Sequence, residues 1–197
     1  MNIVSGFDRP SSGSVELEGR DVTRWRPNRR GRAGLARTFQ HSHAFRELSV
    51  RENVEVAALG AGASSSQARA RADELLDALG LSAQADTSAS ALAQGDERRL
   101  GVARALATNP RFVLLDEPAA GLPEAELPAF SEVVRELRDG REAGVLLIDH
   151  NMGLIMEICD RIHVLDQGRT LAEGTPEDIR ANLDVAAAYL GESAVAE

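Results

Sequence analysis

The sequence predicts an α/β fold in which helices cover a parallel sheet and a helical lobe interrupts the alternation of strands and helices. In the second half of the chain, short apolar runs that suit buried strands alternate with helical patterns. The block from 50 to 108 shows helical patterns alone. With 197 residues, of which 43% are hydrophobic, the chain is long enough for a core domain with a smaller lobe.

Two short strands are expected before the helical block. SVELEG at 14–19 alternates apolar and polar residues and stops at a glycine, and GLARTFQ at 34–40 is predicted as a strand that ends at Gln40. Three helices follow, and Gly80 provides a C-terminal stop for the second. Their sequences are VRENVEVAAL, ARARADELLDALG and ERRLGVARALA.

Strands and helices alternate after the block, and this βαβ order predicts parallel pairing. The predicted elements are the strand FVLLD (112–116), a helix across EAELPAFSEVVRELRD, the strand VLLID (145–149), the helix GLIMEIC and the strand RIHVLD (161–166). DQGR at 166–169 is typical of a hairpin turn. In the following GTPED, we expect Thr175 to cap a helix whose first position is Pro176.

Composition restricts the function classes. The net charge of −9 argues against general nucleic-acid binding, although seven arginines gather between positions 20 and 37; we interpret this cluster as a solvated face. The single cysteine, Cys159, permits no internal disulfide and fits a reducing compartment. Since no apolar run suits a bilayer span, we expect a cytosolic chain whose membrane role comes through a partner.

Two adjacent carboxylates, Asp116 and Glu117, follow the apolar run FVLL. A buried strand that delivers acids to a sheet edge is typical of a site that holds Mg²⁺ on a triphosphate. The triphosphate also needs a loop of the form G-x-x-x-x-G-K-[ST]. The printed sequence contains no such loop, and all 22 of its basic residues are arginine. Taken alone, an Asp-Glu pair is as often an ordinary strand end.

Further motifs accompany these carboxylates. Gly95 stands at the start of a predicted helix whose amide end could face a phosphate. His150 directly follows the strand VLLID; by itself it would more often be a surface histidine. The pair His41 and His43 lacks a third ligand nearby, so a metal site there is a weak alternative.

Together these motifs resemble those of the nucleotide-binding subunits of ATP-binding-cassette (ABC) transporters, most closely the branched-chain amino acid importers. The resemblance covers nearly the whole chain through ARTFQ, LSVRENV, QGDERRLGVARALATNP, LLDEPAAGL, LLIDHNMGLIMEICDRIHVLDQG and AAAYLGE. It implies a P-loop NTPase-like ATPase core formed by 1–40 and 109–197, with a helical subdomain at 41–108 that carries the signature motif.

The resemblance also implies ATP and Mg²⁺ as cofactors and assigns roles to individual residues. Asp116 and Gln40 would contact Mg²⁺, Glu117 would be the general base, and His150 would hydrogen-bond a γ-phosphate oxygen. The signature residues would serve the nucleotide bound by the opposite subunit; they are Ala93, Gln94 and Gly95.

The implied partners are a second ABC ATPase subunit, transmembrane permease subunits that dock near Gln40 and, indirectly, a substrate-binding protein. No nucleic acid is expected among them. The chain would lie on the inner face of the cell membrane as a peripheral subunit. Nothing in such an ATPase motor identifies the transported substrate.

Three departures from the family pattern open alternatives. MNIVSGFDRPSSGSVELEG resembles the segment that follows the phosphate loop, so we expect an ATPase core truncated before that loop by a misplaced start codon, a shortened gene or degeneration. Ala93 replaces the usual signature serine, and Pro123 replaces an asparagine or aspartate. The rival function is therefore a non-catalytic subunit of a heterodimer. An ATPase of DNA repair is disfavoured because the chain lacks room for a long coiled coil.

The resemblance places the strand that feeds the phosphate loop between the strands at 145–149 and 161–166. Without it, we expect either a gap between these strands or their direct pairing, together with exposed apolar surface.

Overall fold

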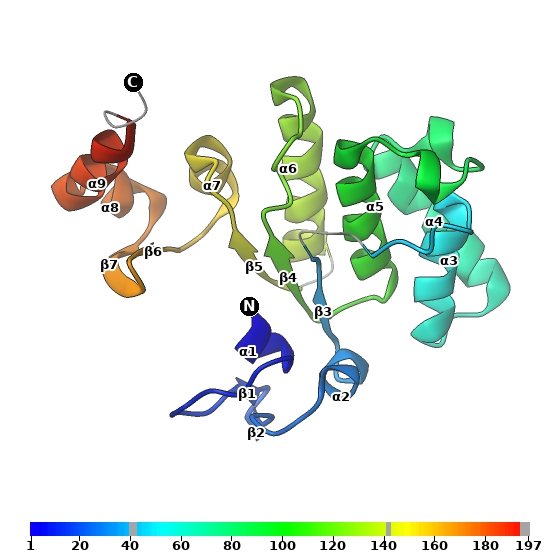
Figure 1. The fold of residues 1–197 in the computed structure, drawn as a ribbon, viewed down its shortest axis with the longest axis horizontal. Coiled ribbons are helices and arrows are strands. Elements are labelled where there is room, and N and C mark those ends of the chain that lie inside the picture. Colours follow the sequence, from blue (N-terminus) through cyan, green and yellow to red (C-terminus); the bar gives the residue numbers. More distant parts are fainter. Residues whose placement is uncertain (40–42, 141–142, 194–197) are drawn as a thin grey trace. The chain divides into compact units, whose positions relative to one another are not determined.

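The computed structural model describes residues 1–39, 43–140 and 143–193 (Figure 1). The chain forms two compact units, Met1–Asp149 and His150–Glu197, and each is described by itself. The expected division into a core and a helical subdomain at 41–108 stays a prediction. Within the described part of the chain, no helix has the length and apolar character that crossing a membrane requires.

A three-stranded parallel sheet forms the centre of the first unit. Its strands are β3 (Leu35–Arg37), β4 (Phe112–Asp116) and β5 (Gly144–Ile148), with β4 in the middle. The three central residues of β4 are buried, as the middle strand of a sheet covered on both faces requires. The parallel pairing predicted for the strands 112–116 and 145–149 is confirmed.

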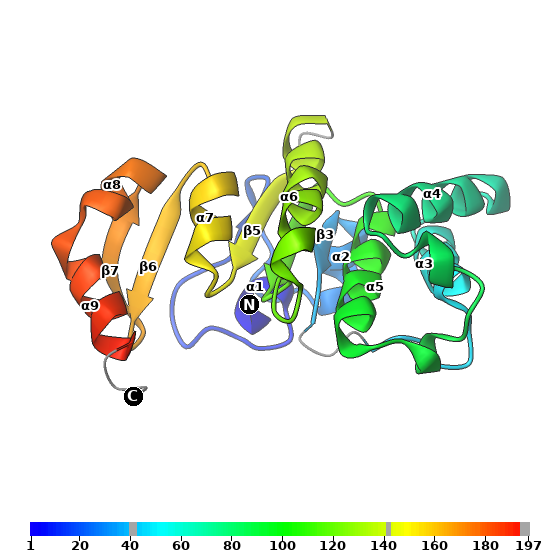
Figure 2. The ribbon, with the colours of Figure 1, turned by 90° about the horizontal axis from the view of Figure 1, so that it is seen from above.

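The three helices predicted for the middle of the chain are present. They are α3 (Val50–Gly60), α4 (Ser65–Ala78) and α5 (Gln94–Ala107), with the short 3₁₀ turns η1 (Ser82–Gln84) and η2 (Ala89–Ala91) before α5. Capping boxes begin α3 and α4, where the Ser49 and Ser64 side chains accept hydrogen bonds from backbone N–H groups. Helix α5 contacts both the sheet and the other two helices, so it joins the lobe to the strands (Figure 2).

The strand expected at 14–19 is present in a shorter form, β1 (Glu16–Leu17). It turns at Glu18 and Gly19 and pairs antiparallel with β2 (Arg20–Asp21). Both turn residues have positive φ values, 51° and 72°, which suit a tight two-residue hairpin turn. The alternating pattern runs into this turn, so the second strand of the hairpin was not predicted.

Arg30 holds the N-terminal elements together. These elements are α1 (Asn2–Ser5), the β1–β2 hairpin and α2 (Pro27–Arg32), and Arg30 lies in α2 with only 1% of its surface exposed. Its guanidinium donates hydrogen bonds to the carbonyls of Ile3, Val4, Val22 and Thr23 at 2.6–3.1 Å. The positive charge thus lies against the C-terminal carbonyls of α1, where a helix favours cations.

The helix predicted across EAELPAFSEVVRELRD is present but irregular. A 3₁₀ turn, η3 (Glu124–Glu126), leads into α6 (Leu127–Arg135), which continues as a π-helical turn, η4 (Glu136–Gly140). Phe130, Val133 and Val134 are buried along α6. This apolar face has the helical spacing that the sequence showed.

The second unit contains α7 (Met152–Ile158), β6 (Ile162–Asp166), β7 (Arg169–Gly174), α8 (Pro176–Ala181) and α9 (Leu183–Ser193). β6 and β7 form an antiparallel hairpin that turns at Gln167 and Gly168, as DQGR predicted. Thr175 forms a capping box with Asp178, and Pro176 takes the first helical position of α8, which confirms the expected cap.

RIHVLD forms β6, which pairs with β7 in a two-stranded antiparallel sheet, while β5 belongs to the three-stranded sheet. Because β5 and β6 lie in different units, the parallel arrangement expected for RIHVLD stays a prediction. β5 pairs with β4, and the expected gap or direct pairing between 145–149 and 161–166 stays a prediction. Leu146 and Ile148 of β5 are 47% and 45% exposed, so apolar surface is open there, as expected.

Candidate functional site

Asp116 and Glu117 lie at the carboxyl end of β4, where the chain turns sharply. Glu117 has φ 45°, a left-handed conformation that is uncommon for a residue with a side chain. Its backbone N–H donates a 2.8 Å hydrogen bond to the carbonyl of Ile148 at the end of β5. The neighbouring strand therefore fixes the turn that presents the second carboxylate.

Arg37 holds one oxygen of the Asp116 carboxylate. Arg37 Nη2 donates to its Oδ2 at 3.1 Å, and both side chains are largely buried. The backbone N–H of Asp116 donates to Thr38 Oγ1 at 3.0 Å, which fixes the main chain as well. In the ranges that the structure describes, no hydrogen bond reaches Oδ1, so this oxygen is available to a further partner.

Arg37 links Asp116 to the N-terminal helix. Its Nη1 donates to Asn2 Oδ1 at 2.7 Å and to Ser5 Oγ at 2.9 Å, so α1 and β4 share one guanidinium. The guanidinium also lies 4.8 Å from the ring centroid of Phe39, within cation–π range. The sequence reasoning used ARTFQ as a motif but gave Arg37 no role. Its position in the strand beside β4 was the signal that could have identified it.

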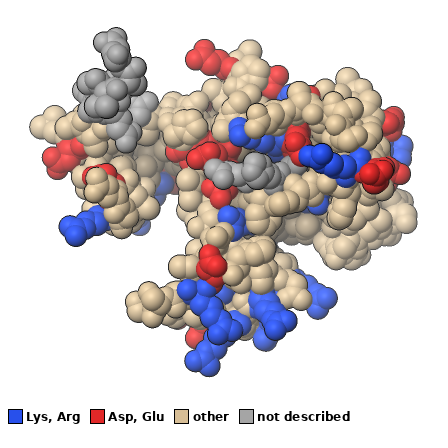
Figure 3. Space-filling model, in the orientation of Figure 1, with Lys and Arg blue, Asp and Glu red and all other residues tan. Residues whose placement is uncertain are grey.

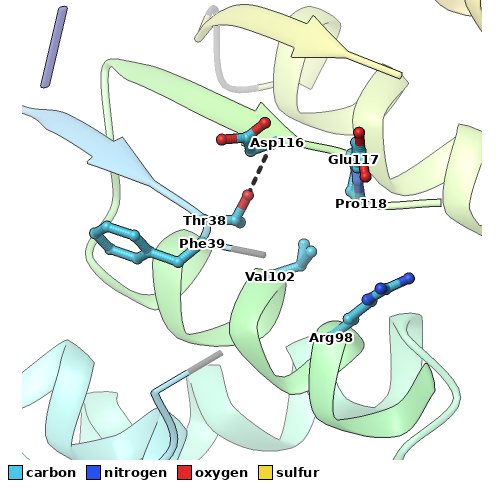
Figure 4. Close-up of a pocket in the computed structure, with 7 residues that line it drawn as sticks. All are labelled: Thr38, Phe39, Arg98, Val102, Asp116, Glu117 and Pro118. Carbon is cyan, nitrogen blue, oxygen red and sulfur yellow. Dashed lines mark hydrogen bonds between the residues drawn. The ribbon is translucent and has the colours of Figure 1, made fainter. Parts of the chain in front are cut away.

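A small hollow opens beside the carboxylates, as Figure 4 shows. Arg98, on α5, donates to the carbonyl of Ala120 and brings a second positive charge to the rim. Sequence reasoning also missed this residue, because the helical pattern alone does not show that α5 faces β4. The residues that line the hollow are Thr38, Phe39, Arg98, Val102, Asp116, Glu117 and Pro118.

The N-terminus of α5 brings the signature residues next to the loop that follows Glu117. Ala93 is the N-cap residue and makes no side-chain capping hydrogen bond, and both Ala93 and Gln94 are exposed. A Cβ added at Gly95 would lie 3.4 Å from the carbonyl oxygen of Gly121, so the glycine permits close approach. The first N–H groups of a helix lack intrahelical acceptors and favour an anion.

Two predicted site residues are not placed with the carboxylates. Gln40 lies outside the described residues. His150 is exposed and is the first residue of the second unit, so its relation to Asp116 stays a prediction. Its neighbour Asp149 belongs to the first unit, where Oδ2 accepts a 3.2 Å hydrogen bond from the N–H of Ala119.

The donor set fits Mg²⁺ bound to a phosphate ligand. Three or more His, Cys, Asp or Glu side chains do not gather into a metal cluster anywhere in the described ranges. Mg²⁺ on nucleotides is commonly held by one or two carboxylates, with phosphate and water oxygens as the remaining ligands. Asp116 Oδ1 is such an oxygen, and Glu117 lies directly beside it along the chain.

Comparison with protein families decides the broad assignment. The family model described as ABC transporter matches residues 1–120, more than half of the chain. The chain belongs to the ABC transporter family. A second model, described as branched-chain amino acid ATP-binding cassette transporter, matches residues 169–195. The resemblance stated from the motifs is therefore confirmed.

Curated relatives agree with this assignment. The high-affinity branched-chain amino acid transport ATP-binding protein LivG of Salmonella typhimurium is 43% identical, over 98% of this chain and 82% of its own length. The corresponding protein BraF of Pseudomonas aeruginosa is 39% identical over the same shares. The lipopolysaccharide export system ATP-binding protein LptB of Haemophilus influenzae is 35% identical, over 96% of this chain and 79% of its own length.

Solved structures confirm the fold of an ABC ATPase. The ATP-binding cassette MJ1267 of an ABC transporter superposes with a TM-score of 0.76 at 25% identity, over 95% of this chain and 81% of that one. The cassette MJ0796 bound to ADP and Pi gives a TM-score of 0.79 at 24% identity, over 89% and 78%. The predicted α/β, P-loop NTPase-like fold class is thus correct.

Proposed function

We propose that this ABC subunit hydrolyses ATP to drive the import of branched-chain amino acids or a related small amide. The observation that carries the proposal is the Asp116–Glu117 pair at the end of β4, where Arg37 holds one Asp116 oxygen and no hydrogen bond within the described ranges reaches the other. The names of the similar LivG and BraF proteins and the family match at 169–195 support the substrate class.

In this function Asp116 Oδ1 contributes a ligand to Mg²⁺, with Gln40 as a second contact. When bound, Mg²⁺ neutralises charge on the phosphate oxygens. Glu117 accepts a proton from the attacking water, and its fixed turn holds the carboxylate beside Asp116. His150 donates a hydrogen bond to a γ-phosphate oxygen.

A dimer completes the site in this proposal. The N–H groups at the start of α5, around Gln94 and Gly95, face the phosphate of a nucleotide held by a second ATPase subunit. Ala93 lacks the hydroxyl that would add one hydrogen bond, so this contact is weaker but retained. Permease subunits dock near Gln40 and bring the chain to the inner face of the membrane, and a substrate-binding protein delivers the cargo to them.

A second candidate function is that of a non-catalytic subunit in a heterodimer. Such a subunit would contribute only the start of α5 to the nucleotide held by its partner. One observation favours it. Pro123 is exposed and has no side-chain donor or acceptor with which to communicate between subunits. The 197-residue chain assayed alone is expected to release phosphate at the background rate.

The DNA upstream of Met1 separates the two functions. An in-frame G-x-x-x-x-G-K-[ST] loop followed by ATP turnover of the longer product supports the catalytic function. Glu117→Gln should then lower turnover by roughly 100- to 10,000-fold, because the general base is removed while the shape is kept. Turnover that survives Glu117→Gln would contradict the role of Glu117, and absence of the loop would favour the non-catalytic subunit.

A further inference from the structure

A strongly positive surface lies on the first unit, away from the carboxylates. Between positions 20 and 37 the chain carries seven arginines and a single acid, Asp21, in a molecule of net charge −9. Figure 3 shows basic side chains gathered over β2 and α2, at the bottom of the view. The arginine face consists of the five exposed members, which are Arg20, Arg24, Arg26, Arg29 and Arg32.

The arginine face is built on a fixed frame. Buried Arg30 ties α2 to the hairpin through the Val22 and Thr23 carbonyls, and Val22 itself is 1% exposed. The Arg29 guanidinium stacks 3.8 Å from the ring centroid of half-buried Trp25. Packing and hydrogen bonds hold the backbone beneath the five side chains. The conformational entropy lost on binding an anion would therefore come mainly from the side chains.

The charges of the arginine face are not neutralised locally. In the residues that the structure describes, none of its five members forms a salt bridge, whereas Arg51, Arg99 and Arg161 each pair with a carboxylate. Asp21, the one acid among these arginines, accepts a 2.8 Å hydrogen bond from the N–H of Thr23, and the hydrogen bonds from Thr23 together with the nearby charge of Arg24 lower its pKa. One carboxylate therefore stands against five exposed guanidinium groups, and this excess of positive charge raises the local concentration of anions at that face.

We propose that the arginine face binds the surface of a bilayer that contains anionic phospholipids. Guanidinium groups form paired hydrogen bonds with phosphate oxygens, which suits lipid headgroups. The net charge of −9 argues against general nucleic-acid binding, whereas acidic groups more than a Debye length of about 8 Å from a bilayer surface are largely screened from it. The choice of a lipid rather than an acidic protein rests on the proposed membrane location.

Vesicle binding tests this directly and needs no nucleotide, so its result is independent of the proposed ATPase function. The chain is mixed with vesicles of phosphatidylcholine alone or with added phosphatidylglycerol, and the bound fraction is measured by sedimentation. Binding is expected only with the anionic lipid, and it should weaken as salt is raised. Arg26→Gln combined with Arg32→Gln should lower the partition coefficient roughly 25-fold, or about fivefold for each arginine.

Two matched variants make the result specific. Arg169→Gln combined with Arg180→Gln removes the same charge from exposed positions of the second unit and should lower binding much less. Arg26→Lys combined with Arg32→Lys keeps the charge and should retain binding within a few-fold. Equal binding to both vesicle types, no binding at low salt, or equal losses in the two glutamine variants would overturn the proposal. Stronger binding to polyglutamate than to anionic vesicles would overturn it in favour of an acidic protein partner.

Discussion

Arg30 illustrates how one buried charge can organise a segment without an acidic partner. Its guanidinium has four backbone carbonyls as acceptors, and burial lowers the pKa of this arginine below its ordinary value. Arg30→Met would remove a donor from all four carbonyls; those of Ile3 and Val22 keep a backbone N–H donor, from Gly6 and Trp25. The free energy of unfolding should fall by about 3 kcal/mol, measured by urea denaturation. The exposed control Arg32→Met should change it by less than about 0.5 kcal/mol, and equal effects would contradict the role of Arg30.

Arg37 and Asp116 should be energetically coupled, because their side chains are largely buried and 3.1 Å apart. A double-mutant cycle with Arg37→Gln and Asp116→Asn should give a coupling energy of about 0.5–3 kcal/mol in unfolding experiments. Arg37→Lys should recover only part of it, since an ammonium group cannot reach Asn2, Ser5 and Asp116 in one plane. Strict additivity of the two single variants would show that the contact contributes nothing.

Among the helices, the stability of the first turn of α3 should depend on pH. The Ser49 backbone and side chain donate hydrogen bonds to the Glu52 carboxylate and lower its pKa. The resulting stabilisation is fully present above the pKa that Glu52 has in the unfolded chain. It is lost as pH falls through the lower pKa that Glu52 has in the folded protein. The protection of α3 amides from hydrogen exchange, expressed relative to the intrinsic exchange rate at each pH, should therefore fall as pH is lowered from about 5 to about 3. Glu52→Gln keeps the capping geometry and should flatten this dependence; an unchanged slope would contradict it.

How much the sequence predicted depended on how local each signal was. The helices α3, α4 and α5 were predicted because the helical spacing of apolar residues, and for α4 the stop at Gly80, lie within each segment. The β1–β2 hairpin was missed because a turn through Glu18, a residue rarely left-handed, leaves little trace in the pattern. The β6–β7 hairpin was predicted because its turn residues, DQGR, lie between the two strands along the chain.

The candidate site divides in the same way. Asp116 and Glu117 were recognisable because a strand end and a pair of acids are adjacent along the chain. Arg37 and Arg98 were not, since their contacts join residues that are far apart in the sequence. Site residues that are brought together by long-range packing can therefore be recognised only in the structure, whereas those within a single motif can be recognised in the sequence.

For the molecule as a whole, exposed apolar surface should dominate behaviour in solution. A groove of about 360 Å³ lies between the β1–β2 hairpin and the sheet, and Val15, Phe112 and Leu146 are among its lining residues. The chain should therefore bind hydrophobic dyes and be poorly soluble. Leu146→Glu should reduce the dye signal, measured by fluorescence, while the equally exposed Leu59→Glu on α3 should not. A monomeric, dye-negative protein with a sharp melt would contradict this expectation.

The guanidinium that α1, β3 and β4 share also has an evolutionary consequence. Asn2 and Ser5 both accept hydrogen bonds from the Arg37 side chain, which in turn holds Asp116. If Arg37 is replaced in a relative, Asn2 and Ser5 lose the donor of these hydrogen bonds. Selection on positions 2 and 5 should then relax as well. Variation at these three positions should be correlated across relatives, and drift at position 37 should precede drift at the carboxylate.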